Sequence, residues 1–140
     1  MRAWIALGLA GVALALAGCG ERGDPAAEKA AATAVEPWLK LVDEGKYAES
    51  WDLSSAYFKA VVTQDQWKLS MGGVRKPLGK VVSRTLSNSR YRTSLPGAPD
   101  GRYVMLQFST TYENKRAAEE TVVQMLEADG QWKVSGYFIR

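Results

Sequence analysis

The chain has 140 residues, with 18 basic and 15 acidic side chains, no histidine and one cysteine. Without histidine it lacks the commonest metal ligand and the side chain best suited to proton transfer near neutral pH. A single cysteine cannot form an intramolecular disulfide. Composition therefore argues against a histidine-dependent enzyme, a histidine metal site and a disulfide-stapled scaffold, and we expect neither a cofactor nor a bound metal.

The first eighteen residues are typical of a secretory signal peptide. Arg2 precedes the uncharged stretch Ala3–Ala17, which is shorter than the ~20 residues that a spanning helix needs. The sequence Leu-Ala-Gly-Cys at 16–19 resembles the lipobox of bacterial lipoproteins. The resemblance implies cleavage before Cys19, diacylglycerol on its sulfur and acylation of the new amino terminus, so that the protein is anchored to a membrane.

The residue after the cysteine is glycine and not aspartate. In lipoproteins this choice implies the outer membrane more than the inner one, with the protein facing the periplasm. Residues 19–25 are then the lipidated cysteine and a polar tether, whose last six residues reach at most about 20 Å at ~3.3 Å each. Residues 26–140 are long enough for a single domain with its own core.

The first half of this domain is predicted to be helical. Apolar residues recur at helical spacing, Pro37 either kinks the first helix or restarts it, and Gly45 ends it. The predicted helices cover 26–44, 46–60 and a short segment that Thr63 caps and that ends at Met71, before the flexible pair Gly72-Gly73.

From Lys80 onward the period changes to alternation, which is typical of strands. Strands are predicted over 80–93, 102–112, 119–128 and 131–140, with loops or turns at 95–101, 113–116 and 129–130. Because the helices come first and the strands follow as a meander, we predict an α+β domain with its helices packed on one face of an antiparallel sheet.

Five stretches carry a resemblance to a known family. They are “WLKLVDEGKYAESW” at 38–51, “QW” at 66–67, “RKPLG” at 75–79, “LPGAPDGRYVMLQF” at 95–108 and “DGQWKVSGYFIR” at 129–140. Together they resemble the DUF4019 family of small bacterial envelope proteins of unknown function. The resemblance implies a cystatin-like or NTF2-like fold, in which a curved four-stranded sheet wraps around helices, and it assigns no catalytic residues.

The clearest electrostatic feature is a basic segment between residues 66 and 99, with seven Lys or Arg and no Asp or Glu. If its strand runs unbroken, Lys80, Arg84, Arg90 and Arg92 face one side, whereas a bulge would split them. Such a stripe suits lipid headgroups, an anionic ligand or an acidic envelope protein. The alternative is a solvated face paired with glutamates of neighbouring strands. Nucleic acid is not an expected partner of an envelope lipoprotein.

Arg75 opens the sequence Arg-Lys-Pro-Leu-Gly, which the family pattern shares. It is either a structural clamp that pairs with a carboxylate of the helices or a cation that faces a ligand. The Pro-Leu-Gly continuation indicates a fixed chain reversal and favours the clamp. The glycines of residues 71–80 lack the spacing of a phosphate-binding loop, and this segment is expected to join the helices to the sheet.

Aromatic residues are the remaining candidates for a binding site. They could line a pocket in the concavity of the sheet, although aromatics at helical or alternating spacing are more often core. The set consists of Trp51, Phe58, Trp67, Phe108, Trp132, Tyr137 and Phe138.

An enzymatic function would need a pocket carboxylate beside a tyrosine, as in some NTF2-like enzymes. The candidate carboxylates Asp43, Asp52, Asp65 and Glu113 stand in contexts typical of the surface. A nucleophile elbow, a phosphate loop and a cluster of metal ligands are absent from the sequence. We therefore predict no catalytic residue.

These observations favour a lipid-anchored envelope protein with a small, non-catalytic binding or accessory domain. The alternatives are an NTF2-like enzyme with an Asp/Tyr pair and a purely structural envelope lipoprotein. The candidate ligand- or partner-binding residues are Arg75, Arg84, Arg90, Arg92, Trp51 and Trp67.

Overall fold

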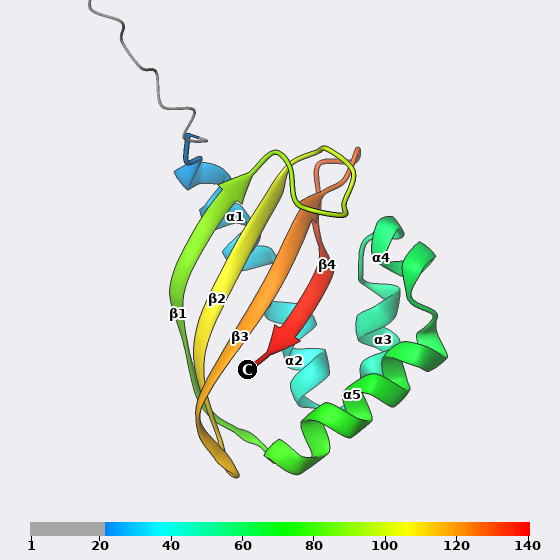
Figure 1. The fold of residues 1–140 in the computed structure, drawn as a ribbon, viewed down its shortest axis with the longest axis vertical. Coiled ribbons are helices and arrows are strands. Elements are labelled where there is room, and N and C mark those ends of the chain that lie inside the picture. Colours follow the sequence, from blue (N-terminus) through cyan, green and yellow to red (C-terminus); the bar gives the residue numbers. More distant parts are fainter. Residues whose placement is uncertain (1–21) are drawn as a thin grey trace, which may run out of the picture.

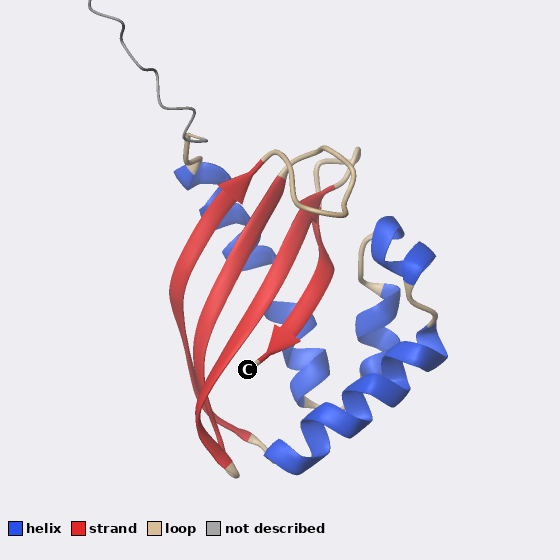
Figure 2. Ribbon diagram, in the orientation of Figure 1, coloured by secondary structure: helices blue, strands red, loops and turns tan. Residues whose placement is uncertain are grey.

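The computed structural model describes residues 22–140 as five helices followed by four strands. The helices are α1 (Pro25–Ala34), α2 (Glu36–Asp43), α3 (Tyr47–Asp52), α4 (Ala56–Val61) and α5 (Gln64–Leu78), and the strands are β1 (Val81–Arg92), β2 (Tyr103–Tyr112), β3 (Lys115–Leu126) and β4 (Trp132–Ile139). Helices α1 and α2 cover one face of the sheet, while α3, α4 and α5 extend beyond β4 (Figures 1 and 2). The predicted α+β class, with N-terminal helices packed against a four-stranded antiparallel sheet, is confirmed.

Local chemistry fixes the ends of the first two helices. Asp24 caps α1 by accepting a hydrogen bond from the Ala27 N–H over 3.0 Å. Pro37 lies in the first turn of α2, where its missing N–H costs nothing, so it restarts the helix after a turn at Val35. Gly45 ends the segment with a φ of 74°, as the sequence predicts.

The single helix predicted over 46–60 is wrong, because Ser54 and Ser55 divide it. Both serines are fully buried, and Ser55 caps α4 by accepting from the Phe58 N–H. The Ser55 N–H also donates to the Val134 carbonyl over 2.8 Å, which attaches this break to strand β4. This backbone hydrogen bond to the sheet therefore overrides the helical spacing of the apolar residues.

Thr63 caps α5 as predicted, in a capping box with Gln66. The predicted end at Met71 is wrong, since the helix continues through both glycines to Leu78. Met71 and Arg75 are buried one turn apart on the same face, so packing holds the helix through a segment of low propensity. Gly79 then ends it with a φ of 75°.

The sheet has the order β1-β2-β3-β4, and every neighbouring pair is antiparallel. The turn between β2 and β3 needs only Glu113 and Asn114, so β3 begins at Lys115, four residues before its predicted start. Between β3 and β4, Gly130 adopts a φ of 82° in the predicted Asp-Gly turn. One register shift in each strand pair, and a second at the start of β1, changes which side chains face the helices.

The core lies between the covered face of the sheet and the helices. Trp38, Leu39 and Val42 of α2 meet Val104, Leu106 and Phe108 of β2 within one hydrophobic cluster. The rings of Trp38 and Trp67 contact Tyr137 of β4, with centroids 5.2 and 6.3 Å from its ring. Within the described residues, this cluster extends from Ala27 to Tyr137.

Candidate functional site

Strand β1 does not present one basic stripe. Its register shifts between Leu86 and Asn88, so that one extra residue, Ser87, interrupts the alternation. Before the shift Arg84 pairs with Thr110, whose side chain is buried on the helix-covered face. After it Arg90 pairs with Met105 and lies on the opposite face, which is called here the open face. The bulge therefore separates Arg84 from Arg90 and Arg92.

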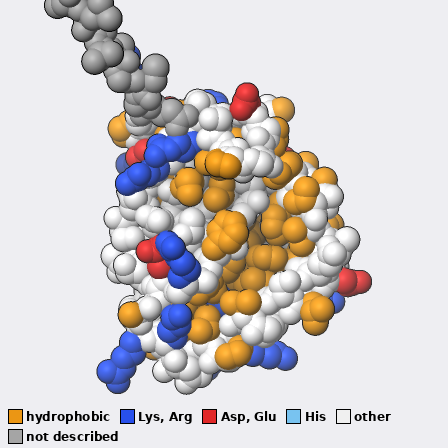
Figure 3. All heavy atoms as spheres, viewed as in Figure 1, with side chains coloured by type: hydrophobic (Ala, Val, Ile, Leu, Met, Phe, Trp, Pro, Cys, Tyr) orange, Lys and Arg blue, Asp and Glu red, His pale blue; other side chains and the backbone are white. Residues whose placement is uncertain are grey.

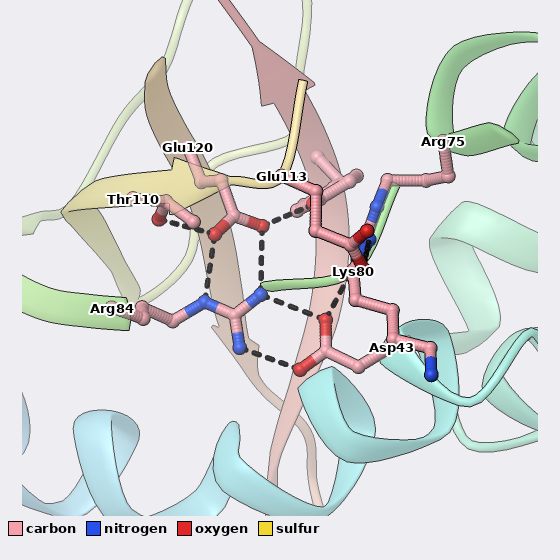
Figure 4. A network of polar contacts seen from close by, with 8 residues as sticks. Asp43, Arg75, Lys80, Arg84, Thr110, Glu113 and Glu120 are labelled. Carbon is pink, nitrogen blue, oxygen red and sulfur yellow. Dashed lines mark hydrogen bonds and ion pairs between the residues drawn. The ribbon is translucent and has the colours of Figure 1, made fainter. Parts of the chain in front are cut away.

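Arg84 reaches the interior and joins two carboxylates (Figure 4). Its Nε donates to Glu120 Oε1 over 2.7 Å. Its Nη1 and Nη2 donate to the two oxygens of Asp43 over 2.8 Å each. This fork-like geometry matches the planar guanidinium, and it connects β1 to both α2 and β3.

Glu120 is the most deeply buried charged group of the described residues, with an exposed fraction of 0%. The hydroxyl of Thr110 donates to its Oε1 over 2.5 Å, and the hydroxyl of Tyr137 donates to its Oε2. Burial alone would raise the pKa of Glu120, but these bonds and the charge of Arg84 hold the pKa below its ordinary value. Glu120 is therefore a charged acceptor whose oxygens are occupied.

Arg75 enters the same region from α5 and is only 5% exposed. Its Nη2 donates to Asp43 Oδ1 over 2.9 Å, and its guanidinium carbon lies 5.0 Å from the centre of the Tyr112 ring. Its Nε and Nη1, like the hydroxyl of Tyr112, are buried without a hydrogen bond to any described residue. Arg75 thus makes the ion pair that the clamp interpretation requires.

These contacts define a network that is called here the buried network after its buried members Arg75, Thr110 and Glu120. It consists of Asp43, Arg75, Arg84, Thr110, Glu120 and Tyr137, and Asp43 lies at its solvent-facing edge with a side chain 27% exposed. Its two cations balance its two carboxylates, and its members come from α2, α5 and the four strands. Burial would raise the pKa of Asp43, but Arg84 and Arg75 hold it below the ordinary value. Burial and the charge of Glu120 raise the pKa of Tyr137, so its hydroxyl stays a donor. The network of ion pairs and hydrogen bonds ties the helices to the sheet.

A shallow cleft of about 520 Å³ lies beside the network, between α1, α2 and β1. Lys29, Lys40 and Arg84 line it together with Glu36 and Asp43, and its floor includes Leu39 and Phe108. The charges of this cleft are mixed in sign, and Arg84 is already engaged with Asp43. The cleft therefore favours no ligand of one charge.

The open face carries a more apolar hollow, the open-face groove, with a volume of about 580 Å³. Met105, Val123 and Gly136 of the sheet form its floor, Phe58 and Trp67 of the helices form its wall, and the loop at 95–98 borders it. Figure 3 shows hydrophobic side chains gathered in this hollow, with basic side chains over β1 beside it. The hydroxyl of Tyr57 donates to the Gly97 carbonyl over 3.2 Å, which attaches the loop to α4.

The register of the sheet aligns four residues of the open face in one row across the strands. Arg90 pairs with Met105, Met105 with Val123, and Val123 with Gly136. Side chains directly opposite on neighbouring strands lie about 4.5–5.5 Å apart, so the row is continuous. It leads from a cation on β1, over two apolar side chains, to a glycine that has no side chain to fill the groove.

Among the predicted aromatic set, the structure separates core from surface. Phe58, Trp67 and Phe108 are buried, whereas Phe138 is 61% exposed. Trp67 donates its Nε1–H to the Ser50 hydroxyl over 2.9 Å and also lines the open-face groove, together with Phe58, Tyr137 and Phe138. Trp51 does not line this groove, and its Nε1–H donates to the Val62 carbonyl over 2.8 Å.

Glutamates of the neighbouring strands were expected to pair with the basic segment at a solvated face, and the burial of one of them, Glu120, was not predicted. A signal was available, since adjacent residues of a strand face opposite sides. The pair Glu119-Glu120 lies within a strand, so one of the two had to face the helices. The structure places Glu119 with Arg140 at the surface and Glu120 inside.

The predicted lipidation site, Cys19, lies outside the described residues. Within residues 22–140, no helix is long and apolar enough to cross a membrane. The first turn of α1 lies beside the carboxyl end of β1, because Glu28 accepts from the Tyr91 N–H over 3.0 Å. A tether that precedes α1 therefore begins at the end of the molecule that carries Arg90 and Arg92.

The family profile described as “Protein of unknown function (DUF4019)” matches residues 34–137. The match starts at the end of α1 and stops within β4, so it includes both the buried network and the floor of the open-face groove. No curated protein matches the chain.

Proposed function

We propose that this chain, which belongs to the DUF4019 family, is a lipid-anchored envelope protein. Its domain binds an apolar chain in the open-face groove and does not catalyse a reaction. The observation that carries the proposal is the groove itself. Its volume of about 580 Å³ lies within the ~300–1,000 Å³ of typical ligand pockets, and its lining is mainly apolar.

The interior supports a binding role more than proton transfer. An effective general base has a pKa near the working pH. The one carboxylate–tyrosine pair of the buried network is Glu120 with Tyr137, and their pKa values are displaced in opposite directions from neutrality. Arg84 also neutralises Glu120. We therefore assign this pair to support of the fold and not to proton transfer.

The proposed lipid anchor at Cys19 favours an apolar ligand for the groove. A lipidated Cys19 with a tether of at most about 20 Å would hold the domain close to the membrane surface, where acyl chains are the most abundant apolar molecules. The groove borders the loop at 95–98, which follows β1 directly. The groove would thus lie near the end of the domain from which the tether starts.

The proposal is tested by a substitution that places a larger side chain on the floor of the groove. A Cβ at Gly136 would meet Val123 and Phe138 at 3.5–3.6 Å, which are ordinary contacts, so Gly136→Leu fits the strand and places its side chain in the groove. The full lipidated protein is placed in phosphatidylcholine nanodiscs with photoactivatable palmitate or photoactivatable hexadecanol. The measurement is the yield of cross-linked protein against probe concentration.

We expect both probes to cross-link to the native protein and Gly136→Leu to lower their apparent affinity by about tenfold. This is the effect of excluding two methylenes at ~0.8 kcal/mol each. The matched control is Ser109→Leu, which adds the same side chain to an exposed position of the open face outside the groove. Equal cross-linking of the native protein and Gly136→Leu would contradict the proposal.

A further inference from the structure

We infer that the ligand of the open-face groove is a long-chain fatty acid, whose carboxylate binds Arg90 while its chain crosses Met105 and Val123 to the hollow at Gly136. The inference rests on the proposed function, since it assigns the headgroup of the chain that the groove would hold. It commits to one occupant, a single-chain lipid with one negative charge.

The row across the open face supplies the geometry. Three strand spacings of ~4.8 Å separate Arg90 from Gly136, which is about 14 Å. Met105 belongs both to the groove and to a small polar hollow lined by Arg90, Arg92, Asn88 and Gln107. The polar hollow, as the headgroup site, and the open-face groove therefore meet at Met105.

The side chains around this polar hollow favour the binding of an anion. Arg90 is exposed, and its guanidinium makes no hydrogen bond or ion pair with the residues that the structure describes. Gln107 Oε1 accepts from Asn88 over 3.1 Å, which leaves the amide N–H groups of Gln107 as further donors beside the same hollow. Among residues 22–140, no carboxylate lines this hollow.

The arrangement suits a carboxylate better than a phosphate monoester. A guanidinium binds a carboxylate through two parallel hydrogen bonds, so one available arginine balances one negative charge. A phosphate monoester carries about −1.5 to −2 charges at neutral pH and would require more than one available cation. Arg90 is the available cation, because Arg92 already donates to the Tyr91 carbonyl and has a further partner.

The test compares a charged with a neutral ligand of equal chain length. The full lipidated protein in phosphatidylcholine nanodiscs is cross-linked with photoactivatable palmitate or photoactivatable hexadecanol, for the native sequence, Arg90→Glu and Arg90→Lys. The bilayer is the same throughout, so partition of each probe into lipid is the same for every variant. Arg116→Glu is the matched control, because it reverses an exposed charge at the other end of the open face.

We expect Arg90→Glu to weaken palmitate binding by at least about tenfold, because the charge-assisted hydrogen bonds of the guanidinium are lost, and to leave hexadecanol unchanged. Arg90→Lys should restore part of the loss, and Arg116→Glu should match the native protein. Unchanged palmitate binding in Arg90→Glu, while Gly136→Leu still blocks both probes, would overturn the fatty-acid inference and leave the proposed function intact.

Two further outcomes would also overturn the inference. Stronger competition by lysophosphatidylcholine or by lysophosphatidic acid than by palmitate would assign the groove to a different lipid. Failure of both probes to cross-link to the native protein would contradict the proposed function and the inference together.

Discussion

Glu120 is the residue on which the interior most depends. Its carboxylate is fully buried and accepts from Arg84, Thr110 and Tyr137, so its removal would leave several donors without a partner. Its neighbour Glu119 has the same charge but lies at the surface, where it pairs with Arg140. The two residues are therefore a matched pair for measuring the effect of burial.

We predict that Glu120→Gln lowers the free energy of unfolding by about 3–5 kcal/mol, as expected when one partner of a buried ion pair is lost. Glu119→Gln should change it by no more than about 1 kcal/mol, as for exposed pairs. Urea unfolding at neutral pH measures both values. Equal effects of the two substitutions would show that the network does not support the fold.

The two carboxylates of the buried network make the stability of the fold depend on pH. The folded-state pKa values of Glu120 and Asp43 lie below the ordinary values of 4.5 and 3.8, so their contribution to stability is complete above those values and is lost as pH falls below them. The unfolded chain binds more protons in that range, and stability therefore decreases on acidification. In the same urea experiment, Glu120→Gln should show a shallower decrease than Glu119→Gln.

At the scale of elements, helix α5 shows how context decides the role of a glycine. Gly73 lies in the helix interior and nothing lies within 4 Å of a Cβ built there. Gly79 ends the same helix with a φ of 75°, and a Cβ there would lie 3.0 Å from the Cβ of Glu113. One glycine therefore weakens the helix, and the other is required by the backbone.

We predict that Gly73→Ala raises the free energy of unfolding by about 0.5–1 kcal/mol, because alanine loses less backbone entropy in a helix. Gly79→Ala should lower it by about 1–3 kcal/mol, because its backbone conformation is strained for a side chain. Thermal unfolding of the two variants distinguishes the signs. A loss of stability in Gly73→Ala would contradict a helix that continues beyond Met71.

The predictability of each element depends on whether its cause is local. The cap at Thr63, the restart at Pro37 and the turn at Gly130 follow from the chemistry of single residues. The cap and the turn were predicted, and the restart was one of the two alternatives given for Pro37. The break at Ser55 depends on a bond to Val134, 79 positions later in the chain, which no local pattern contains.

The same distinction applies to the site. Arginine and tryptophan side chains could be named as candidates from the sequence, but the bulge at Ser87 decided which face each arginine occupies. The row from Arg90 to Gly136 exists only once the register of all four strands is known. Residue types were therefore predictable, whereas their grouping into a buried network and an open-face groove was not.

At the scale of the whole molecule, the proposed anchor would orient the proposed groove toward the membrane. The first turn of α1 is bonded to the carboxyl end of β1, so a short tether would hold that end of the sheet near the membrane. The end that carries Arg90 would then face the source of the ligand. The orientation follows only if Cys19 is lipidated.

We predict that Cys19→Ser abolishes incorporation of labelled palmitate into the protein, because the thiol that receives diacylglycerol is lost. The protein should then remain attached through its uncleaved signal or be released into the periplasm. Labelling of cells that express the native chain or the variant measures this, and normal labelling of Cys19→Ser would overturn the anchor.

The central claim is that the open-face groove, and not the cleft beside α1 and α2, holds the chain of a lipid. The most direct measurement is to map by mass spectrometry the residues that photoactivatable palmitate modifies on the full lipidated protein in nanodiscs. We predict, at the resolution of single residues, modification of Met105, Val123 or Gly136 in β2, β3 and β4. Modification confined to the cleft around Leu39 and Phe108 would contradict it.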